Sequence, residues 1–165
     1  MGIEKDQFLQ TEPMGGESSI AVLGAAVGDD RYLIPMNEVS EVIAIPKLAH
    51  VPLTQPWFLG LANVRGNLYG ITDLGAYLGG SPKPFGLKSR ILLVPNASRV
   101  LAGFVVNSML GIRSLSEFVP GKLLKKNKLP QGIIAQYKDI EGRVWRELSL
   151  FKLIQDERFL RIARE

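Results

Sequence analysis

Apolar residues occur in short runs separated by turn-forming residues along most of the chain. Residues 20–27 are almost all apolar, and the Gly-Asp-Asp sequence at 28–30 that follows them is typical of a tight turn. Residues 31–35 predict the returning strand of a hairpin, and the β-branched residues of 39–45 predict a third strand. Short strands between closely spaced turns indicate an all-β fold.

The second half of the chain repeats this order of elements. Residues 30–33 align with 98–101, and residues 66–69 align with 142–145. In each half a strand leads into a short leucine-containing helix, for which Asp73 is the expected cap in the first half. We therefore expect two lobes, one mostly of residues 20–80 and the other mostly of residues 88–150, with strands near the chain ends free to cross between them. Each lobe is expected to be a small closed barrel, because closure removes exposed sheet edges.

The two ends of the chain differ from this pattern. Residues 1–18 are polar with mixed charge and are interpreted as a flexible N-terminal arm, with neither a signal peptide nor a membrane anchor. The folded domain is expected over residues 19–150. Residues 151–165 predict a C-terminal helix that packs its apolar stripe, with Phe159 and Leu160, against a barrel. No apolar run reaches the roughly 18 residues that a membrane-spanning helix needs, so direct membrane insertion is not expected.

The residues that usually carry chemistry are scarce. The chain has no cysteine and a single histidine, His50. Disulfides and thiolate sites are therefore excluded, and His50 is interpreted as a loop residue because a zinc site needs three or four ligands. No phosphate-cradling glycine motif occurs. We therefore expect no catalysis, no metal and no cofactor.

The net charge of +4 is concentrated in one segment. Removing its four lysines, Lys122, Lys125, Lys126 and Lys128, would leave no net charge. A solvated loop is the expected structure of this segment, and a patch for an acidic partner is the alternative. A small β-barrel with a lysine run also suggests an alternative function in nucleic-acid binding. Residues 122–128 contain no aromatic side chain on which a base could stack, which argues against that alternative.

Four short motifs, in order over residues 20–80, together resemble the CheW family of chemotaxis coupling proteins. They are Val39-Ser40-Glu41-Val42, Pro56-Trp57-Phe58-Leu59-Gly60, Asn63-Val64-Arg65-Gly66 and Asp73-Leu74. The ending of the chain, residues 144–163, resembles the PilI-type members that serve type IV pilus and twitching-motility pathways. The chain departs from the family pattern at Gly75, where an arginine is common, and at residues 137–139.

The resemblance implies a fold of two SH3-like five-stranded β-barrels with short helices and a C-terminal helix. It also implies a non-catalytic cytoplasmic adaptor that is recruited to membrane receptor arrays. Its expected partners are the cytoplasmic tip of a methyl-accepting chemoreceptor and the regulatory domain of a CheA-type histidine kinase. The expected pathway controls twitching motility driven by type IV pili.

The candidate receptor-binding residues, by the same resemblance, are Val39, Gly60, Asn63, Arg65 and Gly66. An arginine on a turn offers up to five donors to carboxylates or helix-end carbonyls, and glycines allow close backbone approach. The structural alternative is that these residues only build a turn of the barrel. The adjacent Trp57 and Phe58 are candidate partner contacts, with one ring expected in the core and the other facing a loop.

Overall fold

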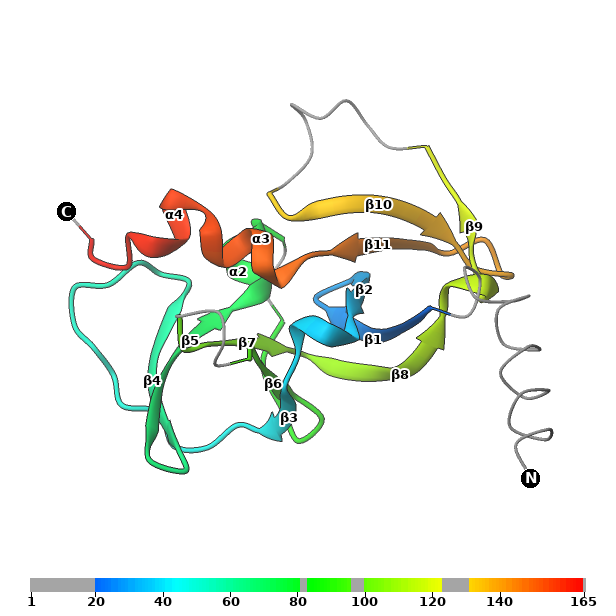
Figure 1. Ribbon diagram of the computed structural model, residues 1–165. Coiled ribbons are helices and arrows are strands. Elements are labelled where there is room, and N and C mark those ends of the chain that lie inside the picture. The colour runs from blue at the N-terminus through cyan, green and yellow to red at the C-terminus, as the bar shows by residue number, and fades with distance from the viewer. Residues whose placement is uncertain (1–19, 81–82, 96–99, 123–130, 165) are drawn as a thin grey trace, which may run out of the picture.

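A computed structural model describes residues 20–80, 83–95, 100–122 and 131–164 of the protein. Two β-sheets and a few short helices make up the described part, so the predicted all-β fold is confirmed. In Figure 1, β7 (Ala102–Val106) of one sheet continues almost directly into β8 (Ser108–Ser114) of the other. Asn107 alone separates these two strands, so a nearly continuous segment passes from one sheet into the other.

The six-stranded sheet is built from both ends of the described chain. Its strand order is β8-β1-β2-β11-β10-β9, with β1 (Ala21–Val27), β2 (Asp30–Pro35), β9 (Val119–Pro120), β10 (Ile133–Lys138) and β11 (Val144–Leu148). Neighbouring strands are antiparallel except β2 and β11, which are parallel. A capping box at η3 (Leu115–Glu117), in which Ser114 and Glu117 exchange hydrogen bonds with the backbone, turns the chain from β8 into β9.

The five-stranded sheet is built from the middle of the chain. Its strand order is β3-β6-β7-β5-β4, with β3 (Glu41–Ala44), β4 (Phe58–Val64), β5 (Asn67–Asp73) and β6 (Arg90–Leu93). The β5–β7 pair is parallel and the others are antiparallel. The helix α2 (Leu74–Leu78) follows β5, and Asp73 caps it as expected, with Oδ1 accepting a hydrogen bond from the Ala76 N–H at 3.2 Å.

The expected division into lobes of residues 20–80 and 88–150 does not describe these sheets. The hairpin β1–β2 pairs with β8 and β11 from the second half of the chain, and β6 and β7 complete the sheet of the first half. The physical reason is that β1 and β2 are buried on both faces, with Val22 and Leu23 pointing into different apolar clusters. Such a hairpin needs cover on both faces and partners at both edges, which distant segments supply. The sheet that contains β1 and β2 has six strands where five were expected, because the two-residue strand β9 is added at its edge.

The C-terminal segment is two short helices where one helix over 151–165 was expected. The first, α3 (Leu150–Gln155), ends at Asp156, which is in an extended conformation and caps α4 (Glu157–Leu160). The backbone of residues 161–164 is not helical, and Ala163 forms a β-bridge with Thr54. The end of the described chain therefore runs from the six-stranded sheet to a loop that precedes β4.

The buried apolar residues of the described chain form three clusters. One cluster lies within the five-stranded sheet and includes Ile71 and Ile91, and another lies within the six-stranded sheet around Trp145. The largest cluster lies between the sheets, where Tyr32 of β2 and Phe104 of β7 both contribute. The sheets are thus two lobes, each with its own core, joined by a third core.

Candidate functional site

The β4–β5 hairpin carries three of the candidate residues on an exposed two-residue turn. Val64 pairs with Asn67, which leaves Arg65 and Gly66 as the central turn residues. Both have positive φ, at 49° and 86°, as the turn type that suits two-residue hairpins requires. Asn63 accepts a hydrogen bond from the Gly66 N–H at 2.9 Å. The turn therefore has a defined conformation although its side chains are exposed.

The side chain of Arg65 binds Glu41, which lies at the start of β3. The guanidinium donates to both carboxylate oxygens, with Nη1 lying 3.2 Å from Oε2 and Nη2 also bonded to Oε1. This hydrogen bonding lowers the pKa of Glu41 and raises the pKa of Arg65. The Arg65 side chain remains 69% exposed, so its remaining donors face solvent.

This ion pair connects the two edge strands of the five-stranded sheet. Strands β3 and β4 stand at opposite ends of the strand order, yet Glu41 of β3 meets the turn at the end of β4. A second connection is the β-bridge between Ala49 and Leu61, in which each residue donates its N–H to the carbonyl of the other. The sheet therefore curls until its edges meet, as the sequence-based expectation of a closed barrel requires.

Gly60 is part of this closure and is buried. Its φ is +133°, and a Cβ placed there would lie 2.4 Å from the Ala49 carbonyl oxygen. The backbone that approaches Gly60 closely is thus the chain's own. Val39 is partly buried and packs against the large cluster between the sheets. Of the five candidates, the structure brings only Asn63, Arg65 and Gly66 together on one exposed turn.

Trp57 and Phe58 are both buried, at 5% and 8% exposure. The Trp57 ring stacks on Phe159 of α4 and meets Tyr77 of α2 edge to face. The expectation that one of the two rings faces a loop as a partner contact is therefore wrong. The Trp57 ring instead packs between Tyr77 of α2 and Phe159 of α4, and Phe58 meets Trp57 edge to face.

Glu41 is the functional candidate that the sequence analysis did not single out. Glu41 belongs to the same motif as Val39, whereas Arg65 belongs to another motif. The opposite charges of these two residues were the signal in the sequence for a contact between the motifs. Two opposite charges in separate turn-and-strand motifs are a pattern that a closed sheet can bring together. Only the strand order, with β3 and β4 at the edges, places them in contact.

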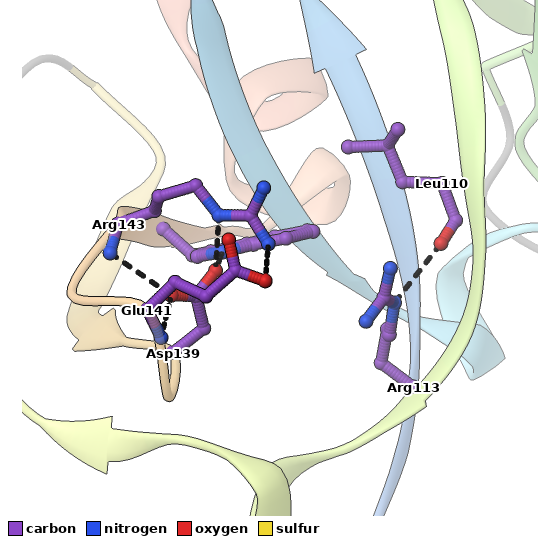
Figure 2. A network of polar contacts seen from close by, with 6 residues as sticks. Leu110, Arg113, Asp139, Glu141 and Arg143 are labelled. Atoms are coloured by element: carbon purple, nitrogen blue, oxygen red, sulfur yellow. Dashed lines mark hydrogen bonds and ion pairs between the residues drawn. The ribbon is translucent and has the colours of Figure 1, made fainter.

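A second polar network lies in the β10–β11 turn of the other sheet. Figure 2 shows Asp139 with Glu141 and Arg143. The Asp139 carboxylate accepts hydrogen bonds from the backbone N–H groups of Glu141 and Arg143, from Arg143 Nε and from Trp145 Nε1. Burial alone raises the pKa of Asp139, but these donors outweigh it and hold the pKa well below its usual range. With every oxygen engaged internally, this carboxylate is a structural part of the turn.

The described residues offer no site with the features of a metal centre. No group of three or more His, Cys, Asp or Glu side chains occurs among them. Within the same residues, no helix has the length and apolar composition needed to cross a bilayer. Of the lysine segment, Lys122 is described and exposed, while Lys125, Lys126 and Lys128 lie outside the described residues.

Comparison with known proteins identifies the family. The CheW-like domain matches residues 21–158. Protein PilI of Pseudomonas aeruginosa is 30% identical over 146 residues, covering 86% of this chain and 79% of PilI, and the chemotaxis protein CheW of Helicobacter pylori is 25% identical over 134 residues, covering 79% and 81%. The crystal structure of the scaffolding protein TtCheW from Thermoanaerobacter tengcongensis superposes with a TM-score of 0.66 at 16% identity, covering 80% of this chain and 90% of that one. The chain therefore belongs to the CheW-like domain family, and its resemblance to PilI-type members extends over most of its length.

Proposed function

We propose that this protein is a non-catalytic adaptor that couples a methyl-accepting chemoreceptor to a CheA-type histidine kinase. Its cytoplasmic pathway controls twitching motility driven by type IV pili. The similarity to PilI and to CheW supports the pathway and the adaptor role. The observation that carries the receptor-binding part is the exposed β4–β5 turn, on which Arg65 is held by Glu41.

The receptor-binding surface in this proposal is the turn of Asn63, Arg65 and Gly66, which we call the hairpin turn. The bidentate contact with Glu41 limits the motion of the guanidinium, so less side-chain entropy is lost on binding. The donors of Arg65 that Glu41 leaves free are available to carboxylates or to carbonyls at the tip of a receptor's helical hairpin. Val39 and Gly60 lie outside this turn and support it indirectly. Val39 packs against the core between the sheets, and Gly60 lets the backbone of Ala49 approach closely where the sheet closes.

The test is capture of partners from lysate by the full chain and by two variants. Arg65→Glu places a carboxylate opposite Glu41, and we expect a folded protein that captures the kinase but at least about tenfold less receptor, because the donors are lost. Combining it with Glu41→Arg restores an ion pair with the charges exchanged. If the ion pair only closes the barrel, the exchanged pair recovers receptor capture.

If the Arg65 donors contact the receptor themselves, the exchanged pair has the thermal midpoint of the wild type but does not recover receptor capture, which is the expected result. A matched control is Lys138→Glu, a charge reversal on an exposed residue of the other sheet. Receptor capture by Arg65→Glu at the wild-type level would contradict the proposal, provided that its unfolding curve is unchanged.

A further inference from the structure

Two adjoining hollows lie between the loop before β4 and the C-terminal segment. The first, about 690 Å³, is lined by Gln55, Trp57, Arg158 and Arg161, among others. The second, about 700 Å³, is lined by Gln55, Leu160, Arg161, Ile162 and Arg164, among others. They share Gln55 and Arg161, so we treat them as one continuous depression, the C-terminal groove.

The walls of this groove are held in place by contacts on both sides. Gln55 donates its backbone N–H to the Ile162 carbonyl at 2.8 Å, and Arg164 donates its own to the Leu53 carbonyl at 2.8 Å. At the other end, Tyr77 Oη donates to Asp156 Oδ2 at 3.0 Å. A groove that is formed before binding loses little conformational freedom when a ligand enters.

The acidic side chain of Asp156 in the groove is satisfied by hydrogen bonds within the chain, whereas the arginine side chains keep free donors. Both oxygens of Asp156 accept hydrogen bonds within the chain, from Tyr77 and from the Arg158 N–H. The Arg158 guanidinium lies 4.3 Å from the centroid of the Tyr77 ring, and a stacked guanidinium keeps its in-plane donors free. Arg161 gives one donor to Glu157 at 2.6 Å and has others left. The side chains that line the groove therefore present an excess of cationic donors.

We propose that the C-terminal groove binds an acidic, extended segment of a partner protein. Arg158, Arg161 and Arg164 supply the donors for its carboxylates. Leu160, which is 55% exposed, and Ile162 supply apolar area for the intervening side chains. This inference does not depend on the proposed receptor and kinase, because it rests on a different surface.

The same observations disfavour other anionic partners. A flat bilayer surface does not enter a concave groove whose donors line its walls. Single-stranded nucleic acid is bound by stacking its bases on exposed aromatic rings. Among the described residues that line the groove, the one aromatic residue, Trp57, is only 5% exposed. An extended peptide can enter a concave groove and can match its mixture of cationic and apolar lining residues.

The experiment measures binding of a labelled peptide of alternating Glu and Val residues to the full chain by fluorescence anisotropy. We expect binding that weakens as salt rises from about 50 to about 500 mM, because the attraction is electrostatic. The double variant Arg161→Glu with Arg164→Glu is expected to bind at least about tenfold more weakly. The matched control reverses two exposed lysines that do not line the groove, Lys88→Glu with Lys138→Glu, and is expected to change affinity by less than about threefold.

A third variant separates binding from a structural role. Glu157→Gln releases Arg161 and removes a negative charge from the groove, so it is expected to tighten peptide binding about twofold or more. Equal losses in the arginine variant and the lysine control would overturn the proposal, because they would show a response to net charge alone. Anionic vesicles or a single-stranded oligonucleotide that displace the peptide and bind more tightly than it does would also overturn it.

Discussion

Arg65 and Glu41 join the two edge strands of the five-stranded sheet through a bidentate ion pair on the protein surface. Because the Arg65 side chain is 69% exposed and the Glu41 side chain is 37% exposed, water screens the pair, which contributes more to the geometry of the hairpin turn than to stability. Its electrostatic signature is the lowered pKa of Glu41, caused mainly by the hydrogen bonds from Arg65 and in part by its charge. The pair therefore makes a prediction that a titration can check.

Arg65→Ala is expected to return the pKa of Glu41 upward, toward its ordinary value of 4.5. Since folding lowers this pKa, the contribution of the pair to stability is present above pH 4.5 and is lost as pH falls through the lowered value. The measurement is an NMR titration of the Glu41 carboxyl in both proteins. Superimposable titration curves would show that the ion pair does not form in solution.

Gly60 and Gly66 provide a matched pair of substitutions in the same hairpin. Gly60→Ala forces a Cβ against the Ala49 carbonyl in addition to an unfavourable φ, so we expect a loss of more than about 2 kcal/mol. At Gly66 nothing lies within 4 Å of the added Cβ, and Gly66→Ala should cost only the left-handed conformation, about 1–2 kcal/mol. Equal midpoints in urea denaturation would contradict the proposed role of Gly60 in closing the sheet.

The local elements of the fold were predictable from sequence because local chemistry determines them. The turn at Gly28, the cap at Asp73 and the polar hairpin turn at Asn63 are all present as expected. The strand partners were not predictable in this way. A buried hairpin such as β1–β2 contains no local signal for which distant strand will cover its edges, and β8 and β11 do so here.

The candidate site was predicted in part for the same reason. Motif order identified Arg65, but the burial of Trp57 depends on Phe159, about a hundred residues further along the chain. The partner of Arg65 likewise became visible only through the closure of the sheet. Residue type predicts what a side chain can do, whereas exposure depends on tertiary contacts that a single sequence does not reveal.

The aromatic contact between Phe159 and Trp57 makes α4 part of the core. Phe159 is 4% exposed and contacts Trp57, Tyr77 and Phe104. Phe159→Ala is expected to destabilise the protein by about 3–5 kcal/mol, through lost burial and the cavity left behind. Its neighbour on the same helix, Leu160, is 55% exposed, so Leu160→Ala should change stability by only about 0.5 kcal/mol.

Denaturant unfolding followed by circular dichroism measures the stability of both variants. Tryptophan fluorescence, to which the distant Trp145 contributes a constant part, reports changes around Trp57 in the folded state. We expect the emission of Phe159→Ala to shift to longer wavelength, because water gains access to the indole. A Phe159 variant as stable as the Leu160 variant would show that α4 is not docked on the five-stranded sheet in solution.

Glu38 is a buried acidic residue, and it connects η1 (Met36–Glu38) with the start of α3 through hydrogen bonds. Its carboxylate accepts hydrogen bonds from Ser149 Oγ at 2.7 Å and from the Leu150 N–H at 2.6 Å. Glu38→Ala leaves both donors without this partner in the interior and should cost about 2–3 kcal/mol. Glu38→Gln retains one carbonyl oxygen as acceptor and is expected to cost less, which urea denaturation of both variants will measure.

The charge of Glu38 also acts on Glu147. Burial raises the pKa of Glu147, the hydrogen bond from Tyr137 lowers it in part, and the charge of Glu38 raises it further. Glu38→Gln removes that charge, so the pKa of Glu147 should fall but stay above its ordinary value, because burial remains. A raised pKa in the folded state contributes stability that is present below pH 4.5 and is lost as pH rises through the folded value. Glu38→Gln should therefore show a smaller loss of stability between pH 4 and pH 7 than the wild type, to the extent that Glu147 determines that loss. An unchanged Glu147 titration in the variant would show that the two carboxylates do not interact, and the role of Glu38 would then be limited to holding α3.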